Sequence, residues 1–208
     1  MANILIYGDS NTHGTAPLEV LGGFTRHPKG SRWPDVVAAA LPDHEVIAEG
    51  LPGRTTVHDD PVEGGNRNGL SVLPAIVLSH VPLDLVVIML GTNDLKPRFG
   101  VTAFEIARSA ERLVREVQGL VPGVPVALVS PVPIREAGVL VDVFDGAEAR
   151  QAGLERQMEA AAARCGVAFI EGGRLAEVSP VDGVHWAPEA HVAFGQAMAP
   201  MLDKLLKD

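Results

Sequence analysis

Four short segments of the chain carry residues whose types and spacing suit acyl transfer. A serine hydroxyl becomes a nucleophile when a base takes its proton, and a histidine oriented by a carboxylate serves as that base at neutral pH. The segment ILIYGDSNTHG supplies Ser10 as the nucleophile. The segment DGVHW supplies Asp182 and His185, three residues apart on a predicted turn that contains Gly183. We therefore predict a catalytic set of Ser10, Asp182 and His185.

Two further segments supply hydrogen-bond donors for the oxyanion of a tetrahedral intermediate. EGLPGRTT contains Gly53, whose backbone N–H has no side chain beside it, and GTND contains Asn93, whose side-chain amide is a donor. The backbone N–H of Ser10 is a third candidate. We predict an oxyanion hole formed by Ser10, Gly53 and Asn93; loss of one such donor typically costs about 2.7–4 kcal/mol of transition-state stabilisation.

The elements that must position these residues are strands and helices in alternation. Short apolar runs rich in β-branched residues predict strands at 4–7, 45–48, 85–90, 124–129 and 167–170. Between and after them, the sequence predicts helices at 34–41, 71–79, 103–117, 147–164 and 188–206. Thr102 and Glu105 have the spacing of a capping box at the start of the third predicted helix. Gly166 is a suitable C-cap after the fourth helix. Ala187, which precedes Pro188 at the start of the last helix, is a poor N-cap.

This alternation predicts an α/β fold, a three-layer α/β/α sandwich around a flavodoxin-like parallel sheet of about five strands. We expect a single domain over residues 1–208. In such sheets ligands bind at the carboxyl ends of the strands, where the four segments would meet. Two long connections, 15–33 and 131–146, are expected to border a pocket or to form a subunit contact. The second carries the apolar patch Val139, Leu140, Val141 and Phe144.

Each of the four segments, taken alone, has a sequence that is common in turns without a catalytic role. Their combination at one edge of the sheet is what favours catalysis. A flavodoxin-like binding module is the alternative from another class. The chain contains neither G-x-G-x-x-G nor a Walker-type phosphate loop, which argues against this module. His58, Asp59 and Asp60 are adjacent in the sequence and have poor spacing for a metal site. Asp9 and Asp94 are expected to hold turns, and the expected role of Arg54 is structural.

The composition of the chain limits the kinds of partner that we expect the protein to bind. The formal net charge is −9 and the basic residues are scattered, which argues against binding of nucleic acid. The longest apolar run, 85–90, is far too short to span a membrane. The single cysteine, Cys165, cannot form an internal disulfide and suits a reducing compartment. We therefore expect a cytoplasmic protein that binds neither nucleic acid nor a membrane.

With these residues in place, the sequence resembles the SGNH (GDSL-like) hydrolases, a family marked by blocks carrying Ser, Gly, Asn and His. The blocks here are GDSNTHG, EGLPGRTT, GTND and DGVH. Asn11 replaces the usual leucine after the serine. Longer stretches, including RWPDVVAAAL and NGLSVLPAIVLSHVPLDLVVIMLGTNDLK, resemble the small bacterial arylesterase/acyltransferase branch, and the likeness spans most of the chain.

The resemblance implies a serine esterase that hydrolyses short-chain acyl or aryl esters and can pass the acyl group to alcohols or peroxide. It further implies a small-molecule ester substrate, no metal, no cofactor and a homo-oligomer. His13 and Thr15 stand where the acyltransferase has bulky tryptophans, so the acyl preference is left open. Carbohydrate acetylesterase, lysophospholipase and thioesterase activities are the alternatives within the family.

Overall fold

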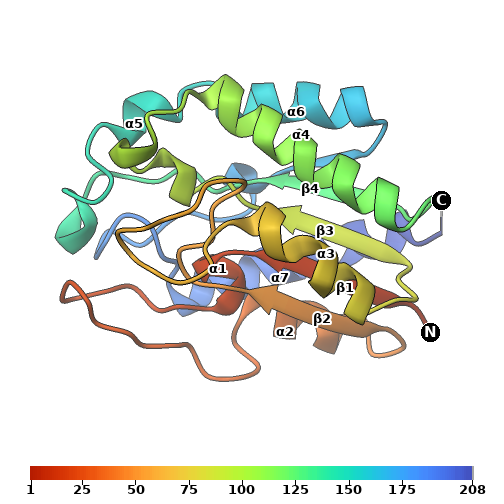
Figure 1. The fold of residues 1–208 in the computed structure, drawn as a ribbon. Helices are drawn as coiled ribbons and strands as arrows, with labels where there is room; N and C mark the ends of the chain where they lie inside the picture. The colour runs from red at the N-terminus through yellow and green to blue at the C-terminus, as the bar shows by residue number, and fades with distance from the viewer. Residues whose placement is uncertain (208) are drawn as a thin grey trace.

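Five parallel strands form the central sheet of the computed structural model, which describes residues 1–207; Asp208, the last residue of the predicted domain, lies outside them. The order across the sheet is β2-β1-β3-β4-β5, and every neighbouring pair is parallel. The predicted α/β fold is confirmed (Figure 1). The strands are β1 Asn3–Gly8, β2 Glu45–Gly50, β3 Leu85–Met89, β4 Val126–Ser130 and β5 Ala168–Glu171.

The burial of the strands explains why they form where they do. All five residues of β3 and all five of β4 are buried, as expected for central strands covered by helices on both faces. The edge strand β2 has no fully buried residue, and its sequence EVIAEG is correspondingly more polar. The apolar run that predicted β3 therefore reflects burial on two faces.

Helices cover both faces of the sheet. Figure 1 shows α3, α4 and α6 on one face and α2 and α7 on the other, and the buried apolar residues form two clusters, one on each side. The helices are α1 Ser10–His13, α2 Trp33–Ala40, α3 Gly69–Ser79, α4 Ala103–Leu120, α5 Ala147–Arg150, α6 Leu154–Cys165 and α7 Pro188–Leu205.

The ends of the helices follow local sequence rules. At the start of α4, the Thr102 hydroxyl accepts a hydrogen bond from the backbone N–H of Glu105, and the Glu105 carboxylate accepts one from the backbone N–H of Thr102. The predicted capping box is thus confirmed. Gly166 ends α6 with φ = 66°, the left-handed conformation expected of a C-cap glycine. Ala187 makes no side-chain cap at the start of α7.

The single helix predicted over 147–164 is wrong. The structure has two helices there, α5 and α6, separated by a turn that ends at Gly153, where φ is 77°. At this turn the side chain of Gln151 makes two hydrogen bonds with the backbone of Ile134, donating to its carbonyl (2.8 Å) and accepting from its N–H (2.9 Å). A tertiary contact overrides helix propensity at this point.

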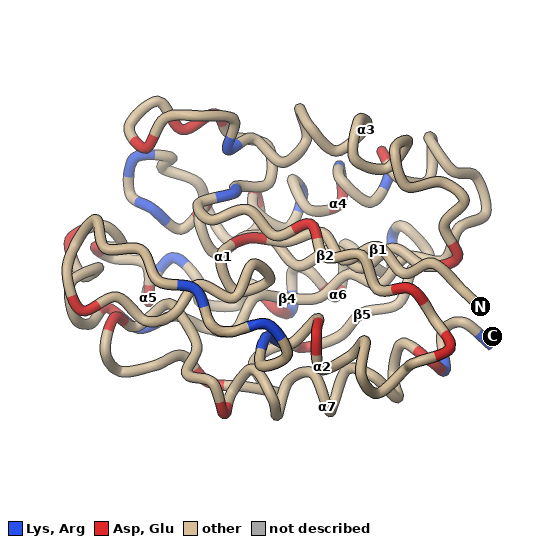
Figure 2. Tube along the Cα trace, turned by 90° about the horizontal axis from the view of Figure 1, so that it is seen from below, with Lys and Arg blue, Asp and Glu red and all other residues tan. Residues whose placement is uncertain are grey.

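Charged residues are spread over many elements. Figure 2 shows Lys and Arg interspersed with Asp and Glu along the Cα trace. Within residues 1–207, no helix combines the length and the apolar character that crossing a membrane would need.

Candidate active site

Ser10 lies at the junction of β1 and α1, at the carboxyl edge of the sheet. The Asp9 side chain caps α1 by accepting a hydrogen bond from the backbone N–H of Asn11 (3.0 Å). The strand turns into the helix in so little space that a Cβ on Gly8 would lie 2.1 Å from the hydroxyl oxygen of Thr12. Ser10 itself is only 4% exposed. The chain reaches the serine directly after the strand, so its position is fixed by the sheet.

Asp182 and His185 contact each other on the turn before α7. The Asp182 carboxylate oxygen Oδ2 lies 2.7 Å from Nδ1 of His185, and Oδ1 accepts hydrogen bonds from the backbone N–H groups of Val184 and His185 (3.0 and 2.9 Å). Burial raises the pKa of Asp182, but these hydrogen bonds outweigh burial and hold it below its ordinary value. The carboxylate therefore stays ionised and leaves Nε2 of His185 free to act toward the cavity.

Two glycines lock this turn to the 131–146 connection. Gly183 has φ = 74°, and a Cβ on it would lie 2.0 Å from the carbonyl oxygen of Arg135. Gly138 has φ = 60°, and a Cβ on it would lie 1.9 Å from the carbonyl oxygen of Val181. The backbone N–H of Arg135 also donates to the carbonyl of Gly183 (2.8 Å). Only glycine allows the two segments to approach this closely.

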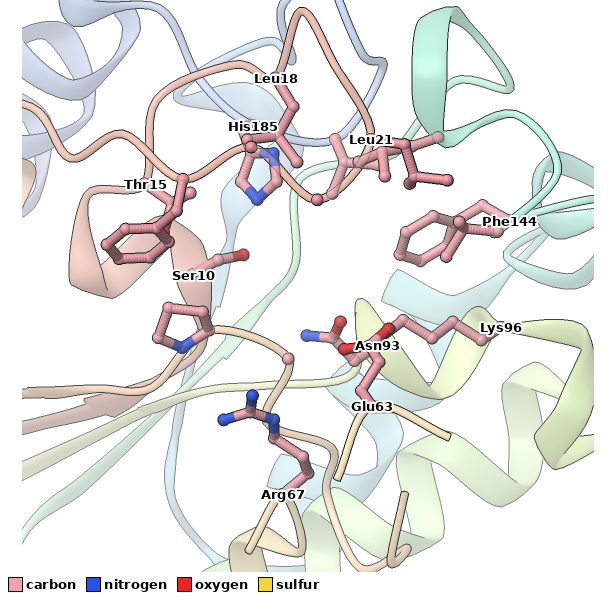
Figure 3. A pocket seen from close by; sticks show the side chains of 18 residues that line it. Ser10, Thr15, Leu18, Leu21, Glu63, Arg67, Asn93, Lys96, Phe144 and His185 are labelled. Carbon is pink, nitrogen blue, oxygen red and sulfur yellow. The ribbon is translucent and has the colours of Figure 1, made fainter. Parts of the chain in front are cut away.

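Ser10, His185 and Asn93 line a single cavity, with the His185 ring on one side of Ser10 and the Asn93 side chain on the other (Figure 3). Gly53, with φ = 79°, lines the same cavity. The Asn93 amide follows β3 and donates one hydrogen bond to the carbonyl oxygen of Arg54 (3.1 Å). Since an amide nitrogen carries two hydrogens, a second N–H remains for a ligand. The structure thus brings all five predicted site residues together.

Hydrogen bonds tie the four segments into one unit. Arg54, which also lies over the Tyr7 ring, donates to the carbonyl oxygen of Gly8 (2.9 Å) and so links the second segment to the first. The carboxylate of Asp94 accepts from the backbone N–H and the hydroxyl of Thr56, which links the third segment to the second. Asn11 Nδ2 donates to the carbonyl of Val184 (3.1 Å), which links the first to the fourth.

The sequence did not predict that the 15–33 connection contacts Asp182. The backbone N–H of Leu18, in the 15–33 connection, donates to Oδ2 of Asp182 (2.7 Å). A backbone donor in an irregular loop leaves no side-chain signal, so the sequence offers no means of finding it.

The cavity has a volume of about 340 Å³ and two chemically different walls. An apolar wall comes from both long connections, through Leu18, Leu21, Phe24, Leu140, Val143 and Phe144. A polar wall is formed by Glu63, Arg67 and Lys96. The 131–146 connection therefore does line the pocket, although Val139 and Val141 are not among the lining residues. Thr15 lines it as well, whereas His13 lies behind and contacts the Thr15 hydroxyl (3.1 Å).

The sequence triplet 58–60 serves structural contacts. The His58 ring stacks on Phe99 with centroids 5.3 Å apart, and Asp60 pairs with Arg98 at 2.9 Å. Within the described part of the chain, no three His, Cys, Asp or Glu side chains gather in a group that could hold a metal ion.

Comparison with known proteins decides the family. The model of the GDSL-like lipase/acylhydrolase family matches residues 6–193. The chain belongs to this family. The match covers the four blocks GDSNTHG, EGLPGRTT, GTND and DGVH, and it confirms both the resemblance and the prediction of a carboxylic ester hydrolase.

Solved structures of esterases are similar over the whole chain. A carbohydrate acetylesterase family member from Sinorhizobium meliloti is 38% identical with a TM-score of 0.91, and the alignment covers 100% of both chains. Est24, a carbohydrate acetylesterase from the same organism, is 33% identical with a TM-score of 0.94, over 99% of this chain and 100% of its own. The aryl esterase of M. smegmatis is 36% identical with a TM-score of 0.92 over the same shares. A search of curated proteins gave no significant match.

Proposed function

We propose that the protein is a serine esterase that hydrolyses short-chain acyl or aryl esters through an acyl-enzyme on Ser10. The observation that carries the proposal is the Asp182–His185 pair, with its Nδ1–Oδ2 distance of 2.7 Å, on the same cavity as Ser10, Gly53 and Asn93. The acetylesterases and the aryl esterase among the similar structures support the same reaction class.

In the first half of the proposed reaction, Nε2 of His185 takes the proton of the Ser10 hydroxyl as Oγ attacks the ester carbonyl carbon. The carbonyl π electrons move to its oxygen. That oxyanion is stabilised by the N–H groups of Ser10 and Gly53 and by the second amide N–H of Asn93. When the tetrahedral intermediate collapses, the bond to the leaving alcohol breaks, and His185 returns its proton to the alcohol oxygen. Asp182 stabilises the imidazolium that exists between these proton transfers.

In the second half, an acceptor attacks the acyl-enzyme while His185 again removes a proton. Water as the acceptor gives a carboxylic acid, an alcohol gives a new ester, and hydrogen peroxide gives a peracid. The intermediate collapses with release of Ser10, whose oxygen recovers the proton from His185. We propose hydrolysis as the main outcome and transfer to alcohols or peroxide as the second.

The size of the cavity favours small esters over long-chain lipids. A volume of about 340 Å³ is at the lower end of the range of roughly 300–1,000 Å³ that is typical of ligand sites. Phe144 and Leu140, both nearly fully buried, close one side of it. A short acyl group fits this space, and a fatty acyl chain would have to displace these side chains.

The test uses p-nitrophenyl esters of graded chain length. We expect hydrolysis of the acetate and butyrate, a decline for long chains, and loss of activity in Ser10→Ala to the uncatalysed rate. Ser79→Ala is the matched control, because Ser79 is exposed at the C-terminal end of α3 and its hydroxyl only contacts the carbonyl of Ile76. Hydrolysis that persists in Ser10→Ala would refute the proposal. A visible absorption band from a bound flavin would instead favour the binding-module alternative.

We also propose that the protein is a homo-oligomer, acting in the cytoplasm. Three apolar side chains of the 15–33 connection, Val20, Leu21 and Phe24, are 64–69% exposed, and Leu21 and Phe24 also line the cavity. Burial of all three by a second copy would remove them from water. Light scattering coupled to size exclusion tests this, with a monomer mass of 21.9 kDa as the result that would refute it.

A further inference from the structure

Residues 17–24 form the tip of the 15–33 connection, and hydrogen bonds hold this tip at one place. Two backbone hydrogen bonds of 2.8 Å close the base of the connection. Within the tip, the backbone N–H of Gly23 donates to a carbonyl of the tip itself (3.0 Å). Among the residues that the structure describes, the only hydrogen bond from the tip to another part of the chain is the one from Leu18 to Asp182. Leu18 is therefore the anchor of the tip.

Leu18 contacts the site with its backbone and with its side chain. Its N–H donates to Oδ2 of Asp182 (2.7 Å), and its side chain is part of the apolar wall of the cavity. The side chain also packs against the core cluster that includes Leu140 and Phe144. Figure 3 shows Leu18 on the same side of the cavity as His185. Because one residue makes both contacts, a displacement of the cavity wall at Leu18 also displaces a donor to Asp182.

The Leu18 N–H completes the hydrogen bonding of a carboxylate that has no access to solvent. Asp182 is 0% exposed and accepts from four N–H groups. Three of them belong to its own turn, whereas Leu18 is 164 positions away in the chain. Burial raises the pKa of Asp182, and the Leu18 N–H is among the donors that lower it. Bulk water cannot replace a donor lost at this depth, so the carboxylate is fully satisfied only while the tip is in place.

The Leu18 donor acts on the carboxylate oxygen that holds the histidine. Oδ2 of Asp182 meets the Leu18 N–H and Nδ1 of His185, both at 2.7 Å, whereas Oδ1 meets two backbone N–H groups of the turn. Because both oxygens have a backbone donor, rotation of the carboxylate about its Cβ–Cγ bond breaks hydrogen bonds at both ends. Such restraint matters, since a misplacement of about 1 Å in a reacting group can lower the rate about 10²-fold.

We infer that Leu18 is a positioning residue for the reaction: its backbone N–H fixes Asp182, which in turn orients His185, while its side chain shapes the cavity. This inference rests on the proposed esterase function. It makes catalysis depend on the closed position of the tip, because a tip that moves away from the cavity takes the Leu18 donor with it. Binding of the ester and activation of Ser10 are then controlled at one residue, through two different groups.

Two substitutions at residue 18 separate these groups in assays with p-nitrophenyl butyrate. Leu18→Ala keeps the N–H and removes most of the side chain, so we expect a higher KM with kcat within about twofold of the wild type. Leu18→Pro removes the N–H as well, so kcat should fall about tenfold to 10²-fold below that of Leu18→Ala.

A backbone exchange removes the N–H alone and decides the test if Leu18→Pro does not fold. Replacement of Leu18 by leucic acid, the α-hydroxy acid with the leucine side chain, puts an oxygen in place of the N–H. We expect kcat to fall by the same factor, with KM unchanged. The same exchange at Val20, with the matching α-hydroxy acid, is the control, because the Val20 N–H makes no hydrogen bond and its side chain does not line the cavity. This control should keep the kcat of the wild type.

A second readout follows the contact without turnover. The His185 ring N–H that faces Oδ2 at 2.7 Å should give a far-downfield proton resonance in NMR spectra. The leucic acid variant should shift this resonance, and Leu18→Ala should leave it in place. An unchanged kcat or an unmoved resonance in the leucic acid variant would refute the inference, as would an equal loss of kcat in the Val20 control.

Failure of the inference and failure of the proposed function give different results. Absence of ester hydrolysis in wild type and Ser10→Ala alike would refute the proposed function, and the NMR resonance would still report whether the Leu18 N–H positions Asp182 and His185. Hydrolysis by the wild type that does not depend on the Leu18 N–H would refute only the inference.

Discussion

Replacement of Asp182 by asparagine tests how the histidine is held. The two carboxylate oxygens face four N–H groups: those of Val184 and His185 meet Oδ1, whereas the Leu18 backbone and the His185 ring meet Oδ2. An amide in this position must turn its NH₂ group toward one of these pairs of donors. Either orientation therefore brings a donor against at least one backbone N–H.

The orientation with NH₂ at the Oδ2 position also gives His185 the wrong tautomer. The amide would donate to Nδ1, the ring proton would move to Nε2, and Nε2 would no longer accept the Ser10 proton. In the serine-protease triad the equivalent change lowers kcat about 10⁴-fold, which corresponds to about 5.4 kcal/mol of activation free energy. The donor left facing Leu18 should further lower the free energy of unfolding by about 1–3 kcal/mol.

The assay is hydrolysis of p-nitrophenyl acetate across pH 5–9, together with urea unfolding of the same preparation. Asp203→Asn is the matched control, because Asp203 pairs with Lys207 near the end of α7, on the far side of the molecule from the cavity. We expect it to retain full activity. If Asp182→Asn kept a tenth or more of wild-type kcat with an unchanged pH profile, the assignment of Asp182 as the group that orients His185 would be refuted.

Two further predictions concern the neighbours of Ser10. Asn93→Ala should lower kcat for p-nitrophenyl acetate about 10²–10³-fold with little change in KM, since its amide acts on the oxyanion of the transition state; a change confined to KM would contradict this. Asp9→Asn should raise the free energy of unfolding at pH 8 by up to about 3 kcal/mol, because burial raises the pKa of Asp9 from 3.8 to about 6 and its ionised form destabilises the fold. This gain is complete above the folded pKa and disappears as the pH falls to the unfolded value of 3.8, where the carboxyl group becomes neutral in both states. Urea titrations of mutant and wild type should therefore coincide at low pH, whereas equal stabilities at pH 8 would argue against a buried charge.

The sequence predicted the sheet and the positions of the site residues because both follow from local patterns. Buried parallel strands produce apolar runs, and a reactive residue placed directly after such a run must lie at the carboxyl edge of the sheet. Ser10 and Asn93 both follow strands in this way. Their roles in catalysis stay a prediction until the variants are measured.

What the sequence did not predict depends on contacts between distant segments. At the break between α5 and α6, Gln151 bonds the backbone of Ile134, a contact that the helical pattern of 147–164 does not show; Gly153, with φ = 77°, is the one local signal of the break in that pattern. The polar wall joins Glu63 and Arg67, both from the connection between β2 and α3, to Lys96 from the connection between β3 and α4, and only the fold reveals this association. The polar side chains in these loops are positioned by hydrogen bonds and ion pairs to distant segments. The sequence pattern of one segment does not predict such contacts.

The interlock of Gly138 with Val181 and of Gly183 with Arg135 has a consequence for engineering. The segment 131–146 supplies part of the wall that shapes the acyl or alcohol pocket, and the turn at 182–185 supplies the general base. Each glycine leaves room for the backbone of the other segment. The 131–146 segment and the turn at 182–185 therefore cannot be exchanged independently of each other. A chimera that takes the pocket loop of a relative must carry over the glycine at 138 and keep the glycine at 183, or the new specificity will come with a displaced histidine.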